Sequence, residues 1–193
     1  MTTREWMDAG TKVFLETVAG LSDADFARAT ALPGWSRAHV VAHVHYNADA
    51  LRRLVRWAVT GVDNRMYTGP HQRRDEIEWG AELPVSALRS LVVSSAAALA
   101  ADLDAMPESA LDFPVITAQG RTVPAREVFW MRAREVWVHS ADLGVPFSWL
   151  PTDFVLALVV EAAEKHASGG KATELAAWFT GRSRTPPSLG PWL

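Results

Sequence analysis

Hydrophobic residues recur every three or four positions along most of this chain, which is the pattern of amphipathic helices. The four longest segments with this pattern span approximately residues 3–19, 37–60, 84–106 and 124–143. Shorter helices are predicted over residues 22–31, 152–166 and 174–179. Four long helices with a loose connection between the second and the third predict an all-α fold, an antiparallel four-helix bundle.

The connections are marked by turn residues and by loss of the pattern. Residues 61–83 are polar and contain several glycines and a proline, so we expect a long loop with one helical turn that covers a site. Residues 107–123 include a short β-branched run and a glycine turn, which predict a small hairpin. Pro124 is expected in the first turn of the helix that follows. A flexible break is expected at residues 168–170, and an extended tail at 181–193.

Charge and composition narrow the functional classes. The formal net charge is −3 with no basic run, so neither nucleic acid nor an anionic membrane is an expected partner. No stretch reaches 18 apolar residues, and Glu5 and Asp8 lie where a signal peptide would be basic and then apolar, so a cytosolic protein is expected. There are no cysteines, hence no disulfide, no cysteine zinc ligand and no cysteine nucleophile. Any thiol chemistry must come from a bound small molecule.

The helix predicted at 124–143 carries the most informative polar residues. Glu135 and His139 are four residues apart and project from the same face, on one line with Arg132 and Asp142. The rest of this helix is apolar nearly all round, so it is expected to be buried. A buried carboxylate and imidazole need a partner, and a metal ion would serve. The alternative is a salt-bridged helix face with a hydrogen-bonded histidine.

A second histidine strengthens the metal interpretation. In the helix predicted at 37–60, His43 lies nearest the apolar stripe, close to Asn47, whereas His45 lies on the other side and His39 lies farther out. His43 is therefore the histidine expected to border the interior. It is alternatively a histidine hydrogen-bonded at the edge of the core, and the i,i+4 pair of His39 and His43 leaves a rival ligand set open.

Metal sites in helix bundles are built from side chains on facing helices. His43, Glu135 and His139 would form such a set, and two histidines with a carboxylate suit zinc of the catalytic type, with iron and other divalent ions as alternatives. In the loop predicted at 61–83, the basic residues are either contacts for an anionic substrate or a solvated charge cluster; they are His71, Arg73 and Arg74.

Three stretches together resemble one known family. They read L-P-G-W-S-R-A-H-V-V-A-H-V-H-Y-N-A-D-A-L over residues 32–51, R-E-V-W-V-H-S-A-D-L-G over 134–144, and E-L-A-A-W-F-T-G-R over 174–182, followed by a final L-G-P-W-L. The sequence is similar over nearly its whole length to the mycothiol-dependent maleylpyruvate isomerases, in the DinB-like superfamily. The shared motifs imply a DinB-like metal-binding bundle over residues 1–150 and a shortened C-terminal helix and tail over 151–193.

The resemblance also implies a site and a reaction. Zinc would be bound by His43, Glu135 and His139, and mycothiol would be the cofactor. The metal would lower the pKa of the mycothiol thiol, and the thiolate would add to the cis double bond of maleylpyruvate, allow rotation, and leave to give fumarylpyruvate. Arg182 matches a catalytic arginine of the family. Arg132, and Asn47 near the ligands, are expected to contact substrate or to support the ligands.

Two other functions remain open from the sequence. A mycothiol S-transferase for detoxification or secondary metabolism would share the metal and the thiol but would form a stable conjugate. A bundle that binds a metal or small ligand without catalysis would take up metal and show no thiol-dependent turnover. In each case the expected partners are small molecules, and the protein is expected to be a monomer or a homodimer.

Overall fold

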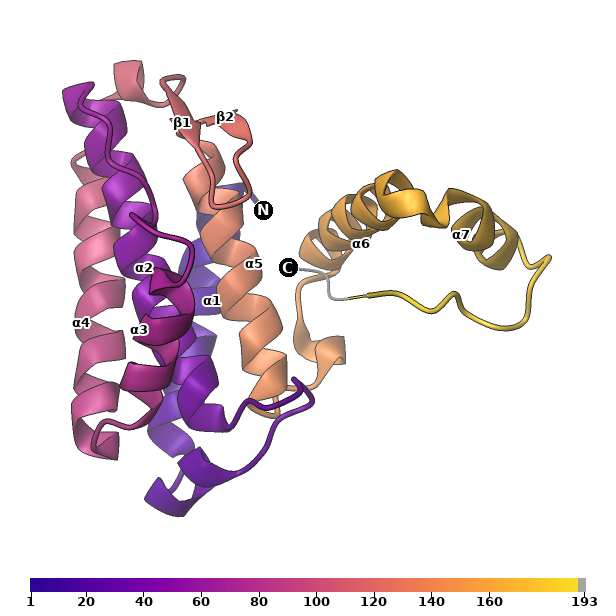
Figure 1. Ribbon diagram of the computed structural model, residues 1–193, viewed down its shortest axis with the longest axis horizontal. Coiled ribbons are helices and arrows are strands. Elements are labelled where there is room, and N and C mark those ends of the chain that lie inside the picture. The colour runs from indigo at the N-terminus through magenta and orange to yellow at the C-terminus, as the bar shows by residue number, and fades with distance from the viewer. Residues whose placement is uncertain (191–193) are drawn as a thin grey trace. The chain divides into compact units, whose positions relative to one another are not determined.

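The computed structural model describes residues 1–190, and these residues form two compact units. The first unit comprises Met1–Trp149, and the second begins at Leu150. Figure 1 shows both units.

The first unit is a bundle of long helices, so the predicted all-α bundle is confirmed. The four main helices are α1 (Thr3–Gly20), α2 (Arg37–Thr60), α4 (Val85–Asp104) and α5 (Glu127–Asp142). The guanidinium of Arg4 contacts Asp104, so the start of α1 lies beside the end of α4. Arg52 likewise binds Asp102, which places the second half of α2 beside that of α4. Thus α2 and α4 run parallel to each other and opposite to α1 and α5.

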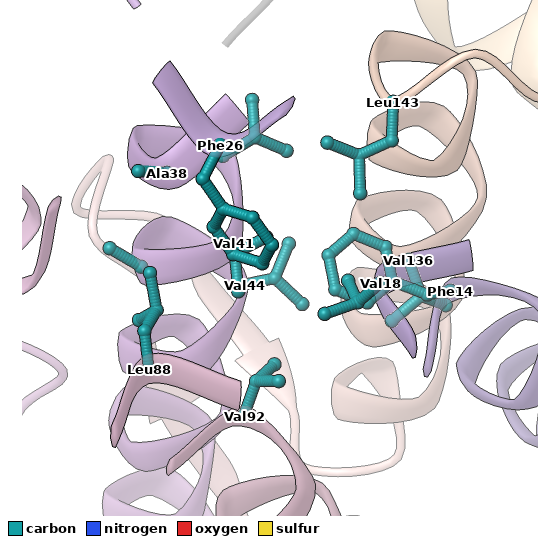
Figure 2. Close-up of a cluster of buried hydrophobic side chains, with 12 residues drawn as sticks. Phe14, Val18, Phe26, Ala38, Val41, Val44, Leu88, Val92, Val136 and Leu143 are labelled. Atoms are coloured by element: carbon teal, nitrogen blue, oxygen red, sulfur yellow. The ribbon is translucent and has the colours of Figure 1, made fainter. Parts of the chain in front are cut away.

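The bundle core is made by the inward faces of these helices. In Figure 2, Phe14 and Val18 of α1 and Val136 of α5 meet the aliphatic side chains of α2, while Leu88 and Val92 of α4 close the cluster from the other side. Each of these five side chains is almost completely buried. Burying a side chain of this size stabilises the fold by about 1.5–3 kcal/mol, so this cluster holds α2 and α5 in a fixed mutual position.

A glycine sets the spacing of α1 and α5. A Cβ atom added at Gly10 would lie 2.7 Å from the Nε1 atom of Trp137 and 2.7 Å from a methyl carbon of Val136. The Trp137 indole also donates a hydrogen bond of 2.9 Å to the carbonyl of Trp6. The two helices therefore pack more closely here than any larger residue at position 10 would allow.

The predicted loop at 61–83 is only partly a loop, and the prediction of one helical turn there is wrong. Residues Gln72–Ala81 form a ten-residue helix, α3, which packs against α2. Its periodicity is weak because Ile77 and Gly80 are its only buried residues. A Cβ atom at Gly80 would lie 2.8 Å from Ala42 and 2.9 Å from Tyr46, so this glycine allows α3 to dock closely on α2.

Short elements complete the first unit. The predicted hairpin is present as β1 (Pro114–Ile116) and β2 (Thr122–Pro124), which pair antiparallel. Pro124 is the last residue of β2, and α5 begins three residues later. The prediction that Pro124 lies in the first turn of the helix is therefore wrong, because Pro124 belongs to the strand. Three 3₁₀ turns occur within the unit: η1 (Asp23–Ala27), η2 (Glu108–Ala110) and η3 (Phe147–Trp149).

Among the described residues, a single helix, α4, is long and apolar enough by composition to cross a membrane. Its mean hydropathy reaches 1.3 over an 18-residue window. Leu88, Val92, Leu99 and Leu103 of this helix are buried within the bundle. The bundle core therefore accounts for these four apolar side chains, although only 28% of the window is buried.

The second unit contains α6 (Thr152–His166) and α7 (Ala172–Phe179), joined by a π-helical turn, η4 (Ala167–Lys171). Gly170 in this turn has φ +93°, a conformation that suits glycine, and it separates the axes of the two helices. The helix predicted from residue 174 begins two residues earlier. The chain after α7 has no regular structure as far as Gly190, and the last three residues of the predicted tail lie outside the described residues.

Candidate metal centre

Helices α2 and α5 bring together the three residues predicted as ligands. His43 lies on α2, and Glu135 and His139 lie one turn apart on α5, which runs antiparallel to α2. One carboxylate oxygen of Glu135 lies 2.8 Å from Nε2 of His43 and 3.3 Å from Nε2 of His139. The rings of the two histidines meet edge to face, with centroids 4.8 Å apart. The carboxylate therefore sits between two imidazoles.

The donor set fits a divalent metal. One ligand atom from each of His43, Glu135 and His139 lies within 4.8 Å of the other two. Ligands about 2.0–2.2 Å from a zinc ion in tetrahedral geometry are separated by roughly 3.3–3.6 Å, so small side-chain rotations suffice to surround an ion. Three protein ligands leave the fourth position open, which is the arrangement of catalytic rather than structural zinc sites.

The electrostatics of the trio are those of a buried ion network. Burial alone would raise the pKa of Glu135, but the two imidazoles beside it lower that pKa well below its ordinary value. Burial lowers the pKa of His43 to about 4, against the attraction of Glu135. Burial also opposes protonation of His139, but hydrogen bonds to Asp142 and Glu135 raise its pKa to about 9. Metal binding would replace the proton shared in this network, since a ligating imidazole is neutral.

Asp142 orients one of the histidines. Its carboxylate accepts a hydrogen bond of 2.8 Å from Nδ1 of His139, three residues earlier on the same helix. A carboxylate accepts only, so Nδ1 carries a hydrogen and Nε2 faces Glu135; on loss of its proton, Nε2 would offer its lone pair to a metal. Carboxylate–histidine pairs of this kind commonly fix the tautomer and the ring of a metal ligand. The sequence placed Asp142 on the polar line of this helix, but its partnership with His139 was not predicted.

The rival histidines have other roles. His39 is the third residue of α2, and its Nδ1 accepts a hydrogen bond from the backbone N–H of Ser36 and lies 2.7 Å from the Ser36 hydroxyl. Its Nε2 lies 3.4 Å from Glu78 of α3, so both ring nitrogens of His39 face partners outside the trio. His45 was expected away from the interior, and this is wrong: only 6% of it is exposed. The reason is that α3, α4 and α5 all pack against α2, so nearly every face of α2 is covered.

Arg132 and Asn47 contact each other beside the trio. Nη1 of Arg132 donates to the carbonyl of Val44 at 2.7 Å and to Oδ1 of Asn47 at 2.9 Å, which ties α5 to α2. Arg132 is 1% exposed, and burial lowers its pKa to about 10. These contacts favour a structural role over substrate binding for this pair.

The ring of Trp35 contacts both histidines of the trio. Its ring centroid lies 5.5 Å from that of His43 and 6.4 Å from that of His139, and its plane is tilted by 29° from that of the His139 ring. Trp35 also contacts a cation: the guanidinium of Arg73 lies 6.0 Å from the Trp35 ring centroid. Trp35 belongs to the turn before α2. Its contacts with His139 and Arg73 could not be predicted from spacing along the chain, because these residues are distant in the sequence.

A cavity of about 530 Å³ opens in the same unit. Its walls are the segment 65–70, Arg73 of α3 and the turn of the β1–β2 hairpin around Thr117. Tyr67 lines it, and burial together with the nearby charge of Glu135 raises the pKa of this tyrosine to about 12, although Arg73 opposes the shift. Arg73 of this wall also lies over Trp35, which contacts His43 and His139, so these two side chains connect the cavity wall to the trio.

With this geometry in view, comparisons with known proteins identify the family. The family described as the mycothiol maleylpyruvate isomerase N-terminal domain matches residues 7–144. The chain belongs to this family. A crystal structure of the mycothiol-dependent maleylpyruvate isomerase is 41% identical, with a TM-score of 0.79 over 84% of this chain and 67% of that one. A histidine-to-alanine mutant of that isomerase matches at 40% identity with the same TM-score and coverage. A comparison with curated proteins found no match.

The family match covers the bundle and ends before the second unit, where the predicted catalytic residue Arg182 lies. Arg182 is exposed just beyond the end of α7. Its Nη1 donates to the carbonyl of Thr180, and its backbone N–H donates to the carbonyl of Ala177 at 2.7 Å. Within its own unit Arg182 therefore closes the end of a helix, and its role toward substrate stays a prediction.

Proposed function

We propose that this chain is a mycothiol-dependent cis–trans isomerase that converts maleylpyruvate to fumarylpyruvate, with a divalent metal, zinc by its donor set, held by His43, Glu135 and His139. The observation that carries this proposal is the convergence of these three side chains from α2 and α5 on one buried point. Membership of the isomerase family and 41% identity to the solved isomerase support it.

The chemistry needs an activated sulfur that the chain cannot supply from its own residues, because it contains no cysteine. A metal ion in this site would lower the pKa of a bound thiol, so that the nucleophilic thiolate predominates near neutral pH. Asp142 and Glu135 hold the imidazole of His139 in one orientation. Trp35 packs over the two imidazoles and limits the access of water to them. The open side is then left for thiol and substrate.

A mycothiol S-transferase is the second candidate. It would use the same trio and the same thiol, and would differ only in releasing a conjugate instead of the free thiol. Two observations favour this candidate. The family match ends at residue 144, before Arg182, the arginine expected to bind substrate, and the guanidinium of Arg182 contacts the end of its own helix.

Product analysis separates the candidates. The purified protein is analysed for metal and then incubated with maleylpyruvate, with and without mycothiol, while the products are followed by NMR. The isomerase predicts fumarylpyruvate at catalytic turnover with the thiol recovered unchanged. A stable thioether product would replace the isomerase with the transferase. Stoichiometric metal with no thiol-dependent turnover of maleylpyruvate or of other electrophiles would contradict both enzymes and leave a non-catalytic metal-binding bundle.

A further inference from the structure

Arg73 is a cation without a carboxylate partner among the described residues. The other arginines around it are paired: Arg53 with Glu76, Arg65 with Asp63, and Arg74 with Asp75. The guanidinium of Arg73 instead lies over the face of Trp35. Such a cation–π contact is worth about 0.5–1 kcal/mol at an exposed site and leaves the edge N–H groups of the guanidinium available to a ligand.

The position of Arg73 links the cavity to the metal centre. It lines the cavity of about 530 Å³ together with Tyr67. It also rests on Trp35, which packs against His43 and His139. The positive charge of Arg73 affects groups in both places: it contributes to the lowered pKa of His43 in the trio, and it opposes the raised pKa of Tyr67 in the cavity wall.

The lining of this cavity suits a small anion. Arg73 contributes positive charge to its wall, Arg65 of the same wall is paired with Asp63, and no Asp or Glu is among the lining residues. Cavities of about 300–1,000 Å³ are typical of small-molecule sites, so a compact dicarboxylate fits. An arginine fork pairs with a carboxylate through two parallel hydrogen bonds, which gives direction as well as charge.

We propose that Arg73 binds a carboxylate of the substrate and so makes this site selective for anionic electrophiles. This inference rests on the proposed function, because it places the substrate in the cavity beside the His43, Glu135 and His139 trio. Trp35 acts as the platform that holds the guanidinium flat, and Tyr67 forms the neighbouring wall. A substrate with two carboxylates leaves its second carboxylate for another group.

The test compares Arg73→Gln and Arg73→Lys with Arg74→Gln, a matched control whose charge is exposed and paired with Asp75. Steady-state kinetics with maleylpyruvate at saturating mycothiol are measured in low and high salt, along with metal content. Arg73→Gln is expected to raise KM at least tenfold with a smaller change in kcat, unchanged metal, and a weaker dependence of KM on salt, since a charge contact is screened by ions. Arg73→Lys should restore part of the loss, and Arg74→Gln should match the parent.

A binding measurement keeps this inference separate from the reaction itself. Calorimetric titration of the metal-loaded proteins with maleate, a cis dicarboxylate, should show binding to the parent that weakens at least tenfold in Arg73→Gln. If maleate binding weakens in this variant although the parent turns over no maleylpyruvate, the proposal that Arg73 binds a carboxylate is supported and the proposal of isomerase activity is contradicted. If the parent is active but Arg73→Gln keeps its KM and its maleate affinity, or if the parent binds no maleate, the role of Arg73 is overturned.

Discussion

Removing the carboxylate of Asp142 should weaken metal binding without unfolding the bundle. Asp142 accepts a hydrogen bond of 2.8 Å from Nδ1 of His139, and only 16% of its side chain is exposed, so the contact is shielded from competing water. Loss of such a supporting contact typically costs about 10–100-fold in metal affinity, or roughly 1.4–2.8 kcal/mol. Asp142→Asn keeps an acceptor oxygen but loses the charge, so we expect about tenfold. Asp142→Ala loses both, and we expect a value nearer 100-fold.

The assay is competition for Zn²⁺ against a chromophoric chelator, supported by the visible spectrum of the Co²⁺-substituted protein, which reports ligand geometry. Glu78→Gln is the matched control, because Glu78 lies 3.4 Å from a histidine of α2, His39, that is outside the trio. Its affinity should equal that of the parent. Urea unfolding of each metal-free variant checks that the fold is kept. Parent-like Zn²⁺ affinity in folded Asp142→Ala would refute the reasoning that Asp142 orients a ligand.

Two further predictions concern packing and substrate binding. Gly10→Ala should lower the free energy of unfolding by about 1–3 kcal/mol in urea titration, because its Cβ would overlap Trp137 and overpacking outweighs the roughly 1 kcal/mol gained in helix propensity. Gly20→Ala, which has open space around it, should be neutral or stabilising, and equal effects at the two sites would contradict the close contact. Arg182→Lys should lower kcat/KM for maleylpyruvate at least tenfold, roughly 1.4 kcal/mol, with metal unchanged, if its fork binds a carboxylate. Parent-like turnover would leave Arg182 as the cap of α7.

The parts of the structure that the sequence predicted are those encoded by local spacing. The long helices follow from hydrophobic periodicity, and Glu135 and His139 share a face because they are four residues apart. His43 was selected because it lies at the edge of the apolar stripe of α2. The family resemblance then joined these two helices, and the structure places the three side chains together.

The errors arose where tertiary contacts override local pattern. Helix α3 was missed because it buries only Ile77 and Gly80, too little to produce a periodic signal. His45 was placed outside because a helical wheel drawn on one stripe does not reveal that α2 is covered by three other helices. The stacking of Arg73 on Trp35 joins residues far apart in the chain, and no spacing rule connects them.

The most direct test of the central claim is the metal content of purified single variants, measured by elemental analysis beside thiol-dependent activity. His43→Ala and His139→Ala are expected to lose most of the bound metal and all mycothiol-dependent turnover, whereas His39→Ala, whose imidazole contacts Ser36 and Glu78 instead, should retain both. Because the bundle core does not depend on the trio, all three variants should remain folded by circular dichroism. The account is contradicted if His39→Ala empties the site while His43→Ala keeps its metal.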